Sequence, residues 1–189
     1  MNKKYYSVTD LGYGFFVVQK KFNSEYKLIH EKGEEFLPEL MPEENVLTKF
    51  SKFSYGYALL QFKGKQAFYM DRFGKALTYK NSTRVIDGEN GSQPFSEGFA
   101  FVFVCLMAFK FIIIKPDGSI FYTLKVANHS REFKNGFTII QERSDIYLLN
   151  TNKRKLYLGK DYTQIKNSIP KIVEKLQGLK GFIFMEICG

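Results

Sequence analysis

Apolar and polar positions recur along the chain with a period of about 40 residues, which is typical of a repeat architecture. In each period, a large apolar residue is followed by two variable positions, a glycine, an aromatic residue and an apolar run. The pattern occurs in LGYGFFVVQ (11–19), FSYGYALLQ (53–61), FSEGFAFVFV (95–104) and FKNGFTIIQ (133–141). Its glycines, which are 42, 42 and 38 residues apart, are Gly14, Gly56, Gly98 and Gly136. The chain is therefore predicted to consist of tandem copies of one unit.

A second pattern follows each of these glycines: an apolar run, a polar residue and, three positions later, another glycine. It occurs in YKLIHEKGEEF (26–36), AFYMDRFGKAL (67–77) and FIIIKPDGSIF (111–121). The fourth copy, IYLLNTNKRKL (146–156), has Lys153 where the others have glycine. Asn152 is expected to take the left-handed conformation there instead, because asparagine tolerates it.

Each unit is predicted to be an antiparallel meander of three strands. The first glycine suits a sharp turn with a positive φ, where a Cβ atom is unfavourable. The second glycine ends a hairpin loop between the next two strands. The third strands are expected at Glu35–Leu37, Ala76–Tyr79, Ile120–Leu124 and Leu156–Leu158. The predicted fold is all-β, with tandem β-meander repeats of about 40 residues in an open or propeller-like array.

The longest apolar stretch, AFVFVCLMAFKFIIIK (100–115), fits this scheme as two strands. A helix that spans a membrane needs about 20 apolar residues, and this run is shorter and contains Lys110. We expect strands at Phe99–Val104 and Phe109–Ile114, joined by a connection over Cys105–Ala108. The sequence therefore predicts no transmembrane segment.

The segment SIPKIVEKLQG (168–178) is predicted to form one short helix. Ser168 is suited to cap it, Pro170 to lie in its first turn and Gly178 to end it. Its expected role is that of a connector or end cap, and the alternative is an amphipathic helix that binds a partner. The next residues, LKGFIFME (179–186), repeat the turn and strand pattern once more.

The chain is thus interpreted as a single repeat domain over residues 1–189. Its predicted parts are repeats at 11–45, 53–90, 95–130 and 133–165, a helix at 168–177 and a partial fifth repeat at 179–189. Exposed sheet edges recruit other chains unless they are covered. Strand-like segments at Lys4–Val8 and Phe182–Ile187 can pair with each other, pair with the outer repeats or extend the last sheet. The variable spacing and the inserted helix favour an open array.

The opening Phe-x-x-Gly-aromatic-x-aliphatic pattern and the later apolar-apolar-Asp-x-x-Gly-Lys turn resemble the bacterial WG-repeat family. The similarity is greatest in FSEGFA (95–100) and YMDRFGK (69–75), and it extends over residues 11 to about 160. The chain lacks the family's Trp-Gly pair and has in its place Tyr26-Lys27, Ala67-Phe68, Phe111-Ile112 and Ile146-Tyr147. The resemblance implies a scaffold of degenerate repeats that acts as an interaction module, with no catalytic residue.

Composition agrees with a β-rich globular protein. The chain is 44% hydrophobic and 25% charged, and its 20 Phe and 12 Tyr favour strands. Cys105 and Cys188 form no CxxC pair, so we expect neither a metal site nor a disulfide framework. Residues Tyr5–Asp10 are too polar for the apolar part of a signal peptide. Together these features favour a cytoplasmic location.

Catalytic chemistry has no sequence signature in this chain. His30 and His129 show neither metal-ligand nor triad spacing and are expected on the solvated surface. The glycine-rich DGENG (87–91) lacks the Gly-Lys-Ser/Thr continuation of a phosphate-binding loop. We therefore expect no enzyme activity, no cofactor and no metal.

Two features suggest binding instead. Gln19, Gln61 and Gln141 recur five residues after the first glycine, as on a binding face or at a solvent-facing strand end. The net charge is +9, and residues 125–180 alone have 12 Lys or Arg against 5 Asp or Glu. The candidate basic residues are Lys153, Arg154, Lys155, Lys160 and Lys166. The sequence predicts a non-enzymatic module with a protein partner; the alternative is weak binding of nucleic acid or another acidic surface through the basic 125–180 face.

Overall fold

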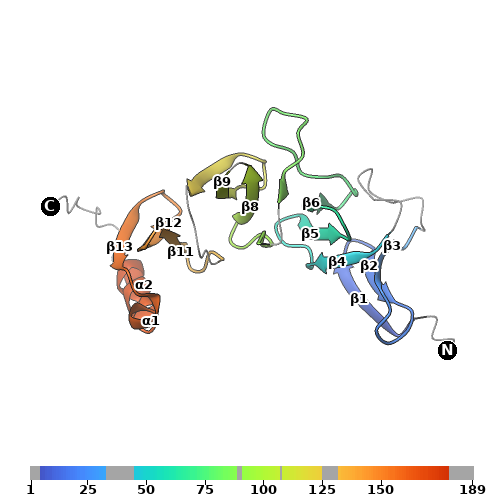
Figure 1. Ribbon diagram of the computed structural model, residues 1–189, viewed down its shortest axis with the longest axis horizontal. Helices are drawn as coiled ribbons and strands as arrows, with labels where there is room; N and C mark the ends of the chain where they lie inside the picture. The colour runs from blue at the N-terminus through green and yellow to red at the C-terminus, as the bar shows by residue number, and fades with distance from the viewer. Residues whose placement is uncertain (1–4, 33–44, 89–90, 107, 125–131, 179–189) are drawn as a thin grey trace.

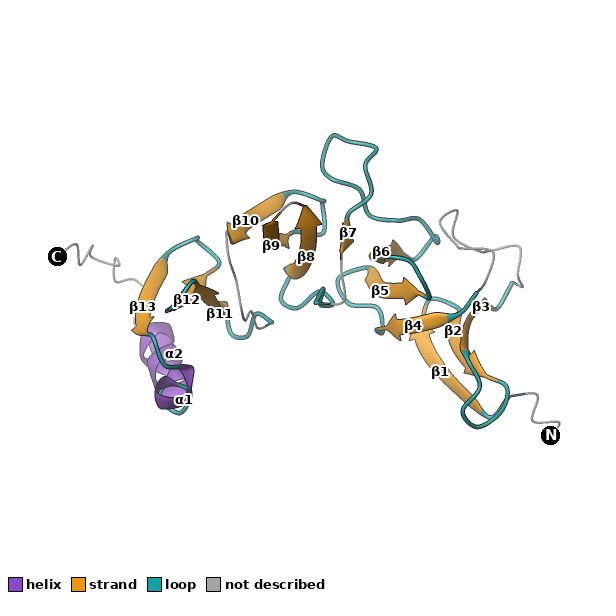
Figure 2. Cartoon of the chain, viewed as in Figure 1, coloured by secondary structure: helices purple, strands orange, loops and turns teal. Residues whose placement is uncertain are grey.

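The computed structural model describes residues 5–32, 45–88, 91–106, 108–124 and 132–178. These residues form antiparallel sheets that follow one another in a curved row, with the helices at the C-terminal end (Figure 1 and Figure 2). The row is open, and its first and last described sheets lie at opposite ends of the molecule. The prediction of an all-β array of meanders is confirmed.

The first two repeats share one seven-stranded sheet in which strands that are neighbours in sequence pair antiparallel. Its strands are β1 (Ser7–Gly12), β2 (Phe15–Gln19), β3 (Tyr26–His30), β4 (Leu47–Phe50), β5 (Tyr57–Phe62), β6 (Ala67–Asp71) and β7 (Asp87–Gly88). The two meanders are joined by one residue pair, Tyr26 with Leu47. The predicted N-terminal strand, Lys4–Val8, overlaps β1 only at Ser7 and Val8, and β1 pairs with β2.

The third and fourth repeats each form a separate three-stranded sheet. Their strands are β8 (Ala100–Leu106), β9 (Ala108–Ile114) and β10 (Ile120–Leu124), then β11 (Phe137–Glu142), β12 (Asp145–Asn150) and β13 (Lys155–Gly159). Two helices follow, α1 (Tyr162–Ile165) and α2 (Ile169–Gly178). One helix was expected; α1 was missed because its four residues are too short to show a helical pattern.

The predicted strands agree with the structure in most places. The predicted third strand Ile120–Leu124 is β10, and Leu156–Leu158 lies within β13. The predicted third strand of the second repeat, Ala76–Tyr79, forms only isolated bridges, such as Met70 with Ala76. The long apolar stretch forms β8 and β9 as expected. The expected connection over Cys105–Ala108 is wrong, because the pairing continues to Leu106 and Ala108. Glu35–Leu37 and Phe182–Ile187 lie outside the described residues.

A tight two-residue turn opens each repeat. Both central residues have a positive φ, as a type I′ hairpin turn requires: Tyr13 (54°) and Gly14 (79°), Tyr55 (51°) and Gly56 (85°), Glu97 (49°) and Gly98 (81°), Asn135 (56°) and Gly136 (80°). In the second to fourth turns the flanking residues exchange two backbone hydrogen bonds, for example between Ser54 and Tyr57 at 2.9 and 3.1 Å. The recurring glycine is thus explained by the handedness of the turn.

In the first, second and fourth repeats, the second turn is held by the polar residue that ends the strand. In the second repeat the Asp71 carboxylate accepts the backbone N–H groups of Phe73 and Lys75. Asn150 does the same for Asn152 and Arg154 in the fourth repeat, each at 2.9 Å. Lys153 itself has the positive φ (64°) of the missing glycine. The expectation that Asn152 takes this role is wrong, because Asn150 accepts the N–H groups of Asn152 and Arg154, and in the turn held this way the left-handed residue between them is Lys153.

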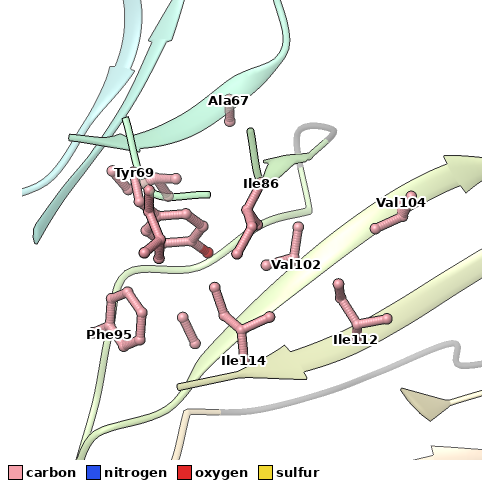
Figure 3. Packing of buried hydrophobic residues seen from close by; sticks show 11 residues of the cluster. Ala67, Tyr69, Ile86, Phe95, Val102, Val104, Ile112 and Ile114 are labelled. Atoms are coloured by element: carbon pink, nitrogen blue, oxygen red, sulfur yellow. The ribbon is translucent and has the colours of Figure 1, made fainter. Parts of the chain in front are cut away.

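Apolar contacts between neighbouring repeats form the core. Alternate side chains of a strand point to opposite faces: Ala58, Leu60 and Phe62 of β5 pack toward the first repeat, and Leu59 packs toward the third. In β8, Val102 contacts the second repeat and Phe101 the fourth. Figure 3 shows the middle junction, with Ala67 and Tyr69 of β6, and Ile86 just before β7, facing side chains of β8 and β9. Both faces of an internal sheet are therefore buried, which explains why its strands are apolar without alternation.

Polar contacts add to the junction between the second and third repeats. The hydroxyl of Tyr69, which is 1% exposed, donates to the carbonyl oxygen of Gln93 at 2.7 Å. Burial raises the pKa of this phenol well above its usual value. The Lys49 ammonium donates to the carbonyl oxygen of Ser92, and partial burial lowers the pKa of Lys49. These bonds satisfy groups that would otherwise be buried without partners.

Two glycines with similar backbone conformations should respond differently to a methyl group. Gly56 (φ 85°) faces open space, whereas a Cβ on Gly118 (φ 74°) would collide with the carbonyl oxygen of Thr78 in the neighbouring repeat. We expect Gly56→Ala to lower the free energy of unfolding by about 1–2 kcal/mol, from the backbone alone. Gly118→Ala should lower the free energy of unfolding by about 3 kcal/mol or more, because the collision with the Thr78 carbonyl oxygen adds to the backbone strain. Urea denaturation of both variants measures this, and equal losses would show that the Thr78 contact is unimportant.

Candidate interaction surface

In the first and third repeats, the first residue of the opening turn reaches the following repeat. The ring of Tyr13 lies edge-on to Phe53, with centroids 5.0 Å apart. The carboxylate of Glu97 accepts the backbone N–H groups of Asn135 and Gly136 at 2.6 and 2.7 Å. Tyrosine and glutamate are poor choices for a positive φ, so a compensating contact is expected. In these turns the contact with the next repeat supplies it.

Aromatic pairs join the repeats at one recurring place, which the sequence analysis did not identify. The residue after the turn glycine contacts the large apolar residue that opens the next copy. The ring centroids are 5.9 Å apart for Phe15 and Phe53, 5.5 Å for Tyr57 and Phe95, and 4.4 Å for Phe99 and Phe133. Both positions belong to the repeat motif, so the signal was present in the sequence. The sequence did not show that the residue after one turn glycine faces the opening residue of the next copy.

The three recurring glutamines lie at the loop between the first two strands of their units. Gln19 and Gln61 are buried, and Gln141 is half-buried. Their side-chain amides donate to loop carbonyl groups: Gln19 to Ser24, Gln61 to Lys65 and Gln141 to Arg143. These bonds shape the loop. A binding role for the glutamines stays a prediction. Because Gln19 and Gln61 are buried, little of their surface is accessible to a partner.

His30 is buried at the end of β3, so its expected place on the solvated surface is wrong. Its Nδ1 accepts the backbone N–H of Lys32, and its ring lies edge-on to Phe15 with centroids 4.5 Å apart. His30 holds the turn position that Asp71 and Asn150 hold in other repeats. The repeat alignment contained this information. His129 lies outside the described residues.

Other expected sites can be placed only in part. Asp87–Gly88 of the glycine-rich DGENG segment form β7, which pairs with Ala67 and Phe68 in β6. Across the described ranges, no group of His, Cys, Asp and Glu is arranged to hold a metal ion. No helix in the same residues is long and apolar enough to cross a membrane.

The candidate basic residues surround the last sheet. Lys153 and Arg154 lie in the exposed turn that leads into β13, Lys160 follows that strand, and Lys166 follows α1. The ammonium of Lys153 lies 5.4 Å from the ring centroid of Phe121 in the third repeat. In the described order β11-β12-β13, the strand β13 is at the edge of its sheet. The charges therefore flank a sheet edge, where backbone groups face outward. We call Lys153, Arg154, Lys160, Lys166 and β13 the basic edge.

Lys155 differs from the other basic residues because it is committed to internal contacts. Its ammonium lies 2.7 Å from the Glu142 carboxylate and 4.6 Å from the ring centroid of Tyr147. Partial burial disfavours the charged form, but the hydrogen bonds with Glu142 and Tyr122 outweigh it and raise the pKa of Lys155. Its charge is therefore balanced, and its role is to fasten β13 to the sheet.

The two lysines at either end of β13 provide a matched test of this difference. Lys155→Ala removes the bond to Glu142 and the packing on Tyr147, and we expect the free energy of unfolding to fall by about 1 kcal/mol. Lys160→Ala removes an exposed side chain, and the change should stay within about 0.5 kcal/mol. Chemical denaturation of the two variants measures the difference. The same loss for both would mean that Lys155 is as dispensable as Lys160.

Comparison with known proteins gives a likeness in structure only. No protein-family model matches the chain, and no curated protein matches it. Among solved structures, the chain is similar to a protein of unknown function from Bacteroides caccae, with 16% sequence identity and a TM-score of 0.36. The match covers 79% of this chain and 58% of that protein's chain, so the chain spans less than two thirds of its relative.

Proposed function

We propose that the chain is a non-enzymatic interaction module, a β-repeat scaffold of the kind that its resemblance to WG-repeat proteins implies. The observation that supports this most is the open, one-dimensional stacking of the sheets. Internal sheet faces are used up in the contacts between repeats. What remains exposed is a long curved surface of turns and strand edges, and extended surfaces of this type serve repeat proteins for binding macromolecules.

The basic edge is the part of this surface that best fits a protein partner. An exposed edge strand can pair with an extended segment of another chain, and flanking side chains then select the partner. Lys153, Arg154 and Lys160 favour a segment with acidic residues. Tyr157 of β13, which is 53% exposed, offers an aromatic contact between them. The partner proposed is an acidic, extended protein segment.

A photo-crosslinking amino acid placed on β13 tests this proposal. At position 157 in the basic edge it should capture one protein reproducibly in the native host. Position 6 is a matched control, because Tyr6 is also an exposed tyrosine (60%) but lies next to β1 at the other end of the array. Captured proteins, identified by mass spectrometry, should come from position 157 and not from position 6. Capture of no specific protein at 157 would contradict the proposal.

A second candidate function is binding of nucleic acid through the same charges. It is supported by the exposure of Lys153, Arg154, Lys160 and Lys166 near one sheet. The alternative is that these basic side chains only increase the solubility of the protein. Phosphate contacts release counterions, so this binding would be independent of nucleotide sequence and sensitive to salt.

The expected binding is weak and falls steeply between about 50 and 200 mM salt. Reversal of Lys153, Arg154 and Lys160 to glutamate should weaken it for all nucleic acid sequences alike. The control reverses Lys20, Lys21 and Lys27, three exposed lysines of the first repeat. Both variants have the same net charge, since +9 minus 6 is +3, so only the position differs. Fluorescence anisotropy with labelled DNA and RNA measures binding, and equal retention by both variants would rule out the basic edge.

A further inference from the structure

A cavity of about 490 Å³ lies between α2 and the outer face of the fourth repeat. Phe137 and Ile139 of β11 and Leu148 of β12 form its apolar sheet side, while Ile169 and Val173 line it from the helix. Phe137 and Ile139 are only half-buried, and no residue of α2 is fully buried. The helix therefore covers this sheet incompletely.

The place of this cavity in the repeat is defined by the register. The third residue after each turn glycine faces the following repeat: Val17, Leu59 and Phe101 each lie in a core that contains side chains of the next copy. Ile139 is the corresponding residue after Gly136. The cavity is thus the position of a fourth junction, in which a following repeat would be packed.

The aromatic pairing leads to the same place. The first residue after the turn glycine contacts an aromatic side chain of the next copy in three successive junctions, Phe15–Phe53, Tyr57–Phe95 and Phe99–Phe133. Phe137 is the corresponding residue of the fourth repeat and lines the cavity. The corresponding position of the fifth copy is Gly178, which has no side chain to cover it. An apolar side chain from a position other than 178 is therefore required to cover the ring of Phe137.

The continuing chain starts beside this cavity. The side-chain amide of Gln177, near the end of α2, donates to the backbone carbonyl of Asn135 at 3.2 Å. Asn135 belongs to the opening turn of the fourth repeat, which the opening turn of the third repeat contacts through the bonds of Glu97 with Asn135 and Gly136. Residues 180–181 (Lys-Gly) are the next such pair in the sequence. The end of α2 therefore lies beside the opening turn of the fourth repeat, where a fifth turn would belong.

We propose that residues 179–189 of this chain dock on the cavity as the first strand of a fifth repeat. The register fixes which side chains enter it. The second and fourth residues after the turn glycine face the preceding repeat, as Ala100 and Val102 do. In the fifth copy these residues are Ile183 and Met185. Ile183 and Met185 then contact Ile139 and Leu148, and Leu179 covers Phe137. Phe182 and Phe184 face away from the fourth repeat.

Methyl NMR on the full chain tests the occupant and the register together. Nuclear Overhauser contacts are expected from the Ile183 and Met185 methyl groups to those of Ile139 and Leu148. Mixing isotope-labelled with unlabelled protein separates contacts within one chain from contacts between two chains. Contacts within one chain support the proposal. Contacts seen only between chains would assign the cavity to a second copy, and an absence of contacts would leave it without the segment; both results overturn the proposal.

Two double variants test the register by a second measurement. Ile183→Ala with Met185→Ala removes the side chains that enter the cavity, whereas Phe182→Ala with Phe184→Ala removes two that face away. Amide hydrogen exchange in residues 137–141 should be about tenfold faster or more in the first variant. It should be unchanged in the second, which controls for the loss of apolar groups as such. Equal acceleration in both, or acceleration only in the second, would refute the assigned register.

Discussion

Face-to-face contact between the apolar sides of successive repeats is the interaction on which this structure depends. No repeat has a core of its own: the buried side chains of β5 are divided between the first and third repeats, and those of β8 between the second and fourth. A sheet taken alone would expose both faces to water, so each unit is stable only between neighbours. The first and last repeats have a neighbour on one side only, so another element or a partner is required to cover the other side.

The turns add geometric precision to these contacts. Tyr13 and Glu97 adopt a conformation that glycine or asparagine would adopt at less cost, and each reaches across to the next repeat. Strain at one residue is thus offset by a contact one repeat further along the chain. Roles are also separated along the chain: the apolar residues join the repeats, whereas Lys160 and Lys166 are exposed beyond β13.

Periodicity in the sequence predicted the units, their antiparallel strands and the turn glycines, because these follow from local rules of handedness and alternation. It failed where packing between repeats decides the outcome. The burial of His30, the bond between Lys155 and Glu142 and the left-handed Lys153 all depend on side chains far along the chain or on a hydrogen-bonded turn. The strand β4 (LTKF) was missed because its four residues contain no apolar run and are ordered by pairing with β5. For the candidate surface, the sequence located the charges but did not distinguish the lysine that is used internally.

The division of every internal core between two repeats has a mechanical consequence. Tension applied to the two ends of such a row passes through the junctions one after another, because the described part of the chain has no apolar core that joins the first repeat to the fourth. Each junction then bears the whole load, and the weakest one determines the force at which the row gives way. Because each internal repeat is stabilised from both sides, the loss of one junction also weakens the repeats that adjoin it.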